Sequence, residues 1–138
     1  MKRCAVLFVN PTPQQSAHPD YLRDLGFLVH EIDNWPEDDQ KVRDYQIVIV
    51  LLQQAGAAPM LAARMRAKPH FGRRLLVGLV PAETPLHARR DAEISGFDEV
   101  VSDACDSRDL SAKLLRGLRA RPELRCALPP PINGRSAA

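Results

Sequence analysis

The chain has 138 residues, of which 45% are hydrophobic and 26% charged, and its formal net charge is +2. This length fits one domain with a single core, and the composition is that of a globular domain rather than a disordered chain. The small net charge argues against a dedicated nucleic-acid-binding protein. Four arginines do crowd near the C-terminus, and they are read either as a solvated helix face or as a nucleic-acid contact. They are Arg116, Arg119, Arg121 and Arg125.

The first residues and the cysteines indicate a cytoplasmic protein. The apolar run that follows Arg3 has about six residues, too few for a secretion signal or a membrane span. An odd number of cysteines without a signal peptide is typical of a reducing compartment. We therefore expect no intramolecular disulfide. Cys4 begins the first strand and Cys105 follows the fifth, so in a parallel sheet these two would lie at opposite edges.

In the first half of the chain, short apolar runs alternate with helical patterns. Residues 4–9 (CAVLFV) predict a buried strand, and 18–25 predict a helix that Gly26 ends. Residues 27–32 predict a second strand. A short, weak, acidic helix is expected to follow over 34–42.

The second half continues this alternation. Strands are predicted at 47–52, 75–80 and 98–102. The spacing of apolar residues predicts a helix over 58–65, and Thr84 is expected to cap another that has Pro85 as its first residue. Asp106 or Ser107 is expected to cap the last helix, which carries a leucine stripe.

Five strand–helix units without tandem strands predict an α/β fold, a three-layer doubly wound domain with a five-stranded parallel sheet. We assign residues 1–126 to this domain. Residues 127–138 contain Pro, Ser and Gly without periodicity, and we interpret them as a flexible C-terminal tail or linker stub.

The sequence contains none of the common catalytic or cofactor-binding motifs. The seven glycines form no phosphate-binding loop, no nucleophile elbow occurs, and the four histidines lack metal-ligand spacing. Asp103 and Asp106 are the only carboxylates expected where the fifth strand ends, and helix capping accounts for at least one of them. We therefore expect no enzyme activity, no cofactor and no metal.

Four segments, in the right order, resemble the receiver domain of bacterial response regulators over about residues 3–121. They are LRDLGFLVHEIDN, YQIVIVL, MLAARMRAKP and SGFDEVVSDA. The resemblance implies a flavodoxin-like sheet with strand order 2-1-3-4-5. A doubly wound domain of unrelated ancestry is the alternative, since fold alone does not establish function.

The resemblance also places the family's functional positions on this chain, and each holds a residue of a different kind. The Mg²⁺-binding acidic pair falls at Asn10 and Pro11, and the phospho-accepting aspartate at Leu51. The switch Ser or Thr falls at Val80, and the lysine at Asp103. These five residues would form a degenerate phospho-acceptor pocket, closed by Leu51 and Val80.

The resulting hypothesis is a phosphorylation-independent, receiver-like signalling module in a bacterial two-component or transcription-control pathway. Its partner would be a protein, namely a histidine kinase, an output domain or a second copy in a homodimer, with no membrane contact. Nucleic acid would be reached only through an output domain outside this chain. The candidate interface comprises Arg89, Arg90, Arg116 and Arg119. The alternative is a small-molecule sensor or an enzyme domain of the same fold.

Overall fold

A computed structural model shows one five-stranded sheet in which every neighbouring pair of strands is parallel. It describes residues 3–11, 15–34, 42–52, 58–69, 73–124 and 126–127. The strand order is β2-β1-β3-β4-β5, which confirms the expected flavodoxin-like topology. The strands are β1 (Ala5–Val9), β2 (Leu28–Ile32), β3 (Ile47–Leu51), β4 (Leu75–Val80) and β5 (Glu99–Ser102).

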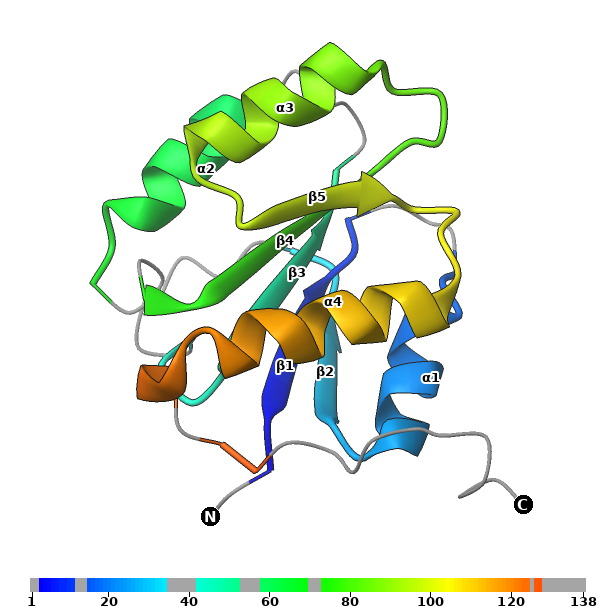
Figure 1. Cartoon of the computed structure of the whole chain (residues 1–138), viewed down its shortest axis with the longest axis vertical. Coiled ribbons are helices and arrows are strands. Elements are labelled where there is room, and N and C mark those ends of the chain that lie inside the picture. The colour runs from blue at the N-terminus through cyan, green and yellow to red at the C-terminus, as the bar shows by residue number, and fades with distance from the viewer. Residues whose placement is uncertain are drawn as a thin grey trace.

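Helices cover both faces of the sheet (Figure 1). They are α1 (His18–Leu25), α2 (Ala58–Arg66), α3 (Leu86–Ser95) and α4 (Ser107–Arg119), followed by a short 3-10 helix, η4 (Pro122–Leu124). Because helices lie above and below the central strands, every residue of β3 and β4 is buried. Continuous apolar runs at these positions are the sequence pattern that such burial requires.

The core is divided by the sheet into two halves. Leu22 of α1 and Leu114 of α4 pack with one set of strand side chains. Met65 of α2 and Ala92 of α3 pack with the set that points the other way. Successive residues of a strand face opposite sides of the sheet, so neighbours along β3 and β4 belong to different halves.

The sequence predicts three helix ends, and two of these predictions agree with the structure. Gly26 ends α1 in the left-handed conformation, with φ of 111°, and the Asp106 side chain caps α4 by accepting from the backbone N–H of Arg108 at 2.9 Å. The expected start of α3 is wrong by one residue: Pro85 is the N-cap, with an extended ψ of 150°, and no side chain caps the helix. Most of the acidic helix expected over 34–42 lies outside the described residues.

The expectation that no disulfide forms is wrong. Cys4 is bonded to Cys126, with the two Cα atoms 4.8 Å apart, and Ala127 pairs in parallel with Arg3. The argument against a bridge to Cys105 holds, and that cysteine is free. Because α4 runs antiparallel to the strands, the chain after it returns to the edge where β1 begins.

None of the helices in the described part of the chain has the length and hydrophobicity needed to span a bilayer.

Candidate functional site

A hollow of about 360 Å³ lies at the carboxyl edge of the sheet, beside the end of β3. Ligands of open α/β sheets collect at this edge. Its described lining consists of residues from the start of α1, the end of β3 and the β5–α4 loop. They are Gln15, Ser16, Ala17, His18, Leu51, Asp103, Ala104, Cys105 and Ser107.

The five residues of the degenerate pocket do not all meet in this hollow. Leu51 and Asp103 both line it. Leu51 is only 7% exposed and packs in the half-core of α1 and α4, whereas Val80 is fully buried in the half-core of α2 and α3. Asn10 and Pro11, just beyond β1, are not among the lining residues, and Asn10 donates its backbone N–H to Ile32 O at 2.8 Å.

His18 is a buried polar residue of the hollow that the sequence analysis did not single out. It is 4% exposed. Its Nε2 lies 3.2 Å from the backbone oxygen of Asp103, and its Nδ1 lies 2.7 Å from Oγ of Ser107. A carbonyl only accepts, so Nε2 carries a proton, and in the neutral ring Nδ1 accepts from the Ser107 hydroxyl. The ring thereby joins the start of α1 to the β5–α4 loop.

Cys105 lines the same hollow but is poorly suited to act as a nucleophile. Burial raises the pKa of its thiol, and the nearby carboxylate of Asp109 raises it further, although Lys113 opposes this shift. A raised pKa leaves less thiolate at neutral pH, and the thiolate is the reactive form.

The hollow therefore has polar walls without a recognisable catalytic set. The described lining residues carry one carboxylate, one imidazole, one amide, two hydroxyls and one thiol whose pKa is raised. Within the described ranges no cluster of three or more His, Cys, Asp or Glu residues could hold a metal ion. Leu51, at the end of β3, has no group that can accept a phosphoryl group.

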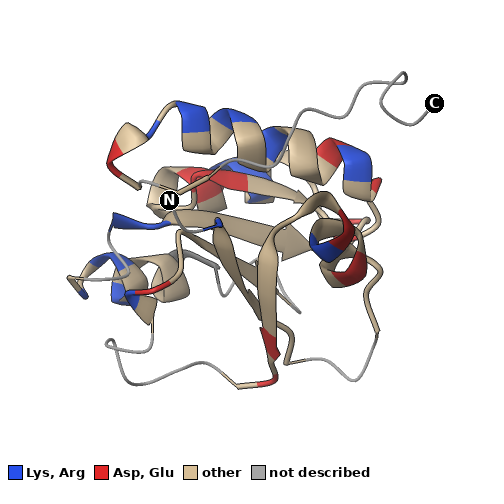
Figure 2. Cartoon of the chain, turned by 90° about the horizontal axis from the view of Figure 1, so that it is seen from below, with Lys and Arg blue, Asp and Glu red and all other residues tan. Residues whose placement is uncertain are grey.

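A second candidate site is the mixed-charge face formed by α4 and the edge strand β5. Glu99 of β5 lies 3.7 Å from Arg116 and 3.9 Å from Lys113. Cations follow one another along α4 beside the acidic start of β5 (Figure 2). Arg119 on α4 and Arg90 on α3 are exposed, whereas Arg89 donates to the backbone oxygen of Ala82 at 3.2 Å.

Helix α3 adds apolar side chains that the sequence analysis did not consider. Leu86 is 62% exposed and Ile94 is 84% exposed. Asp98, just before β5, is partly buried between Arg66 and Arg121 and so adds little exposed negative charge beside Glu99.

The similarity of this chain to known proteins was found by comparing structures. No protein-family model matches the chain, and no curated protein matches it by sequence. Receiver domains of response regulators share its fold. HP1043, an orphan response regulator of H. pylori, is 16% identical with a TM-score of 0.68, over 84% of this chain and 97% of that one.

Two further solved structures are similar. An atypical orphan response regulator, described as having a phosphorylation-independent regulatory mechanism, is 18% identical with a TM-score of 0.66, over 83% of this chain and 95% of that one. A response regulator from Thermotoga maritima is 17% identical with a TM-score of 0.66, over 83% and 96% of the two chains. The chain thus has the five-stranded flavodoxin-like fold of response regulator receiver domains.

Proposed function

We propose that the chain is a receiver-like signalling domain that regulates by protein–protein contact without being phosphorylated. It would act in the cytoplasm, in a bacterial two-component or transcription-control pathway. The observation that carries this proposal is Leu51, which stands at the end of β3 where the resemblance places the phospho-accepting aspartate, and which is buried in the core. The similar fold of an orphan regulator described as phosphorylation-independent supports the same conclusion.

The partner in this proposal is a histidine kinase, an output domain or a second copy of the chain. The mixed-charge face of α4 and β5 is the candidate contact surface, together with Arg90 of α3. Exposed charges of both signs set the relative orientation of two proteins and raise their association rate more than they raise their affinity. The exposed Leu86 and Ile94 would supply apolar area to such a contact.

Incubation with acetyl phosphate and Mg²⁺ tests the absence of phosphorylation directly. We expect the intact mass to stay unchanged, because Leu51 cannot accept a phosphoryl group. A receiver domain that retains its aspartate serves as the positive control in the same reaction. A base-labile adduct of about 80 Da, the mass of the transferred group, would contradict the proposal.

The alternative, a small-molecule sensor of the same fold, is favoured by one observation. The hollow beside Leu51 has a volume of about 360 Å³, within the usual range of ligand pockets. Native mass spectrometry of protein purified from its host distinguishes the two functions. A bound small molecule that is lost when His18 is changed to Asn would favour the sensor. An empty pocket in protein that associates with itself or a partner would favour the docking domain.

A further inference from the structure

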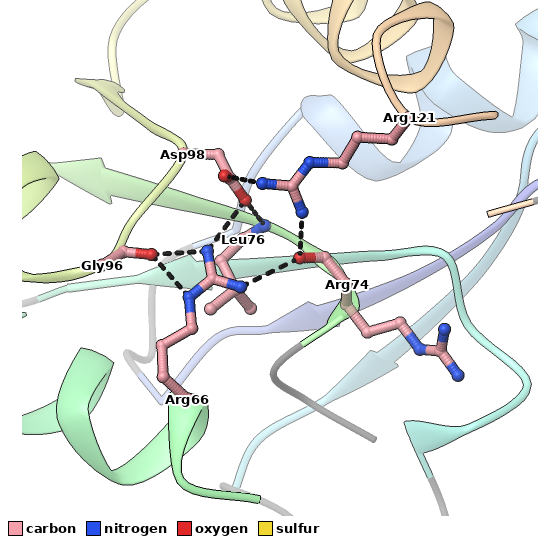
Figure 3. A network of polar contacts seen from close by, with 6 residues as sticks. All are labelled: Arg66, Arg74, Leu76, Gly96, Asp98 and Arg121. Carbon is pink, nitrogen blue, oxygen red and sulfur yellow. Dashed lines mark hydrogen bonds and ion pairs between the residues drawn. The ribbon is translucent and has the colours of Figure 1, made fainter. Parts of the chain in front are cut away.

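A network of polar side chains holds together the opposite, amino edge of the sheet (Figure 3). The carboxylate of Asp98, just before β5, accepts from Arg66 at 3.0 Å, from Arg121, and from the backbone N–H of Leu76 at 2.8 Å. The three charged side chains are only 18–28% exposed. Their charges are consequently screened less by solvent than those of surface pairs.

This network retains positive charge. Two guanidinium groups share the single carboxylate of Asp98. Arg66 and Arg121 also both donate to the backbone oxygen of Arg74, at 3.3 and 3.1 Å. These contacts position the Arg121 guanidinium and the chain at Arg74 before any ligand arrives.

A hollow of about 890 Å³ opens beside the network. Three arginines, Arg73, Arg74 and Arg121, are among the residues of its described lining, and Glu123 is the only acidic residue there. The remaining described lining is small or apolar and includes Leu124. The hollow is therefore a basic pocket with an apolar part, within the size range of small-molecule sites.

Two of these arginines have donors left for a ligand. Arg73 is exposed and forms no hydrogen bond or ion pair within the described part of the chain. The contacts of Arg121 with Asp98 and Arg74 use two of its five N–H groups. A guanidinium presents its N–H groups as a planar fork, which matches the oxygens of a phosphate.

We propose that this basic pocket binds a small molecule that carries a phosphate or pyrophosphate group. Arg73 and Arg121 would hold the phosphate oxygens, and the side chain of Leu124 would contact an apolar part of the ligand. Several guanidinium groups against one carboxylate suit a group with more than one negative charge. The pocket lies at the edge of the sheet opposite Leu51, so it is separate from the degenerate phospho-acceptor pocket and independent of the proposed docking function.

Calorimetric titration of the full chain with inorganic pyrophosphate, at constant ionic strength, tests this proposal. We expect saturable binding, which Arg73→Gln weakens about tenfold through the loss of a charge-assisted contact. Arg73 is exposed and unpaired, so this variant should fold normally. Arg64→Gln, the same change at an exposed arginine of α2 outside the pocket, is the matched control and should bind like the wild type.

Three results would overturn the proposal. The first is no saturable heat with pyrophosphate up to about 10 mM, a range that would reveal a Kd near 1 mM. The second is equal weakening by Arg73→Gln and Arg64→Gln, which would mean general charge attraction. The third is equally tight binding of citrate at the same ionic strength, which would mean that the pocket does not distinguish phosphate from carboxylate.

Discussion

At the scale of single residues, Leu51 decides the chemistry of the sheet's carboxyl edge. Full burial of a leucine side chain stabilises a fold by about 1.5–3 kcal/mol, and Leu51 is 93% buried by its 7% exposure. An aspartate at this position would instead need water, a cation or hydrogen-bond donors around its carboxylate. Asp103 lines the same hollow as Leu51, so its carboxylate would repel a second negative charge at position 51.

We predict that Leu51→Asp destabilises the protein without making it a phosphorylation substrate. A poorly solvated carboxylate and the lost apolar packing should together lower the free energy of unfolding by about 3–5 kcal/mol. Urea unfolding measures this loss, and acetyl phosphate followed by intact mass measures phosphorylation.

Leu51→Asn is the matched control, since it has nearly the same shape as Asp but no charge. The difference between the two variants isolates the cost of the carboxylate. If Leu51→Asp were as stable as the wild type and gained a phosphoryl group, the rest of the acceptor machinery would be present after all.

At the scale of elements, the Arg66–Asp98–Arg121 network joins the end of α2, the start of β5 and the chain after α4. The apolar periodicity of the sequence predicts these elements one by one and does not indicate that they meet. Arg66 ends α2, Asp98 precedes β5, and Arg121 follows α4. Arg66 Nε also donates to the backbone oxygen of Gly96 at 2.8 Å. One carboxylate thus connects both helical layers to the amino edge of the sheet.

We predict that Asp98→Asn lowers the free energy of unfolding by about 1–3 kcal/mol, because two partly buried guanidinium groups lose their shared carboxylate. Thermal and urea unfolding measure the loss. Asp91→Asn, the same substitution at an exposed position of α3, should change stability by less than about 0.5 kcal/mol. Equal effects of the two substitutions would show that the network contributes little to stability.

At the scale of the whole molecule, the mixed-charge face of α4 and β5 is the surface on which we expect association. Reversal of two exposed cations, Arg90→Glu with Arg119→Glu, should weaken self-association or partner binding at low salt and leave the circular dichroism spectrum unchanged. Sedimentation at low and high salt measures this effect. Arg43→Glu with Arg64→Glu reverses two exposed cations that lie outside α3, α4 and β5, and is the matched control. Unchanged association in the first double variant would place the interface on another face.

The Cys4–Cys126 disulfide also acts on the whole molecule, since it joins residues 122 positions apart in sequence. We predict that Cys126→Ser lowers the free energy of unfolding by about 2–4 kcal/mol under oxidising conditions, because such a bond restricts the unfolded chain. Adding a reductant to the wild type should reproduce the loss, whereas Cys105→Ser should not. Identical unfolding curves with and without reductant would show that the bond does not form in solution.

The sequence by itself determined the local features of this protein. The alternation of apolar runs and helical patterns predicted the parallel sheet, and motif resemblance predicted its strand order. Gly26 and Asp106 marked helix ends because capping depends on a few adjacent residues. The resemblance to receiver domains assigned Leu51 to the phospho-acceptor position, and β3 ends at this residue in the structure.

The tertiary structure alone decided which distant residues meet. Neither the bond of Cys4 to Cys126 nor the contact of His18 with Ser107 follows from any local pattern. Periodicity reports which face of an element is apolar, but not how far along its neighbour that element packs. The polar hollow at the carboxyl edge of the sheet, and the basic pocket and the disulfide at the amino edge, each form where segments far apart in sequence meet, and packing of the whole domain sets where they meet.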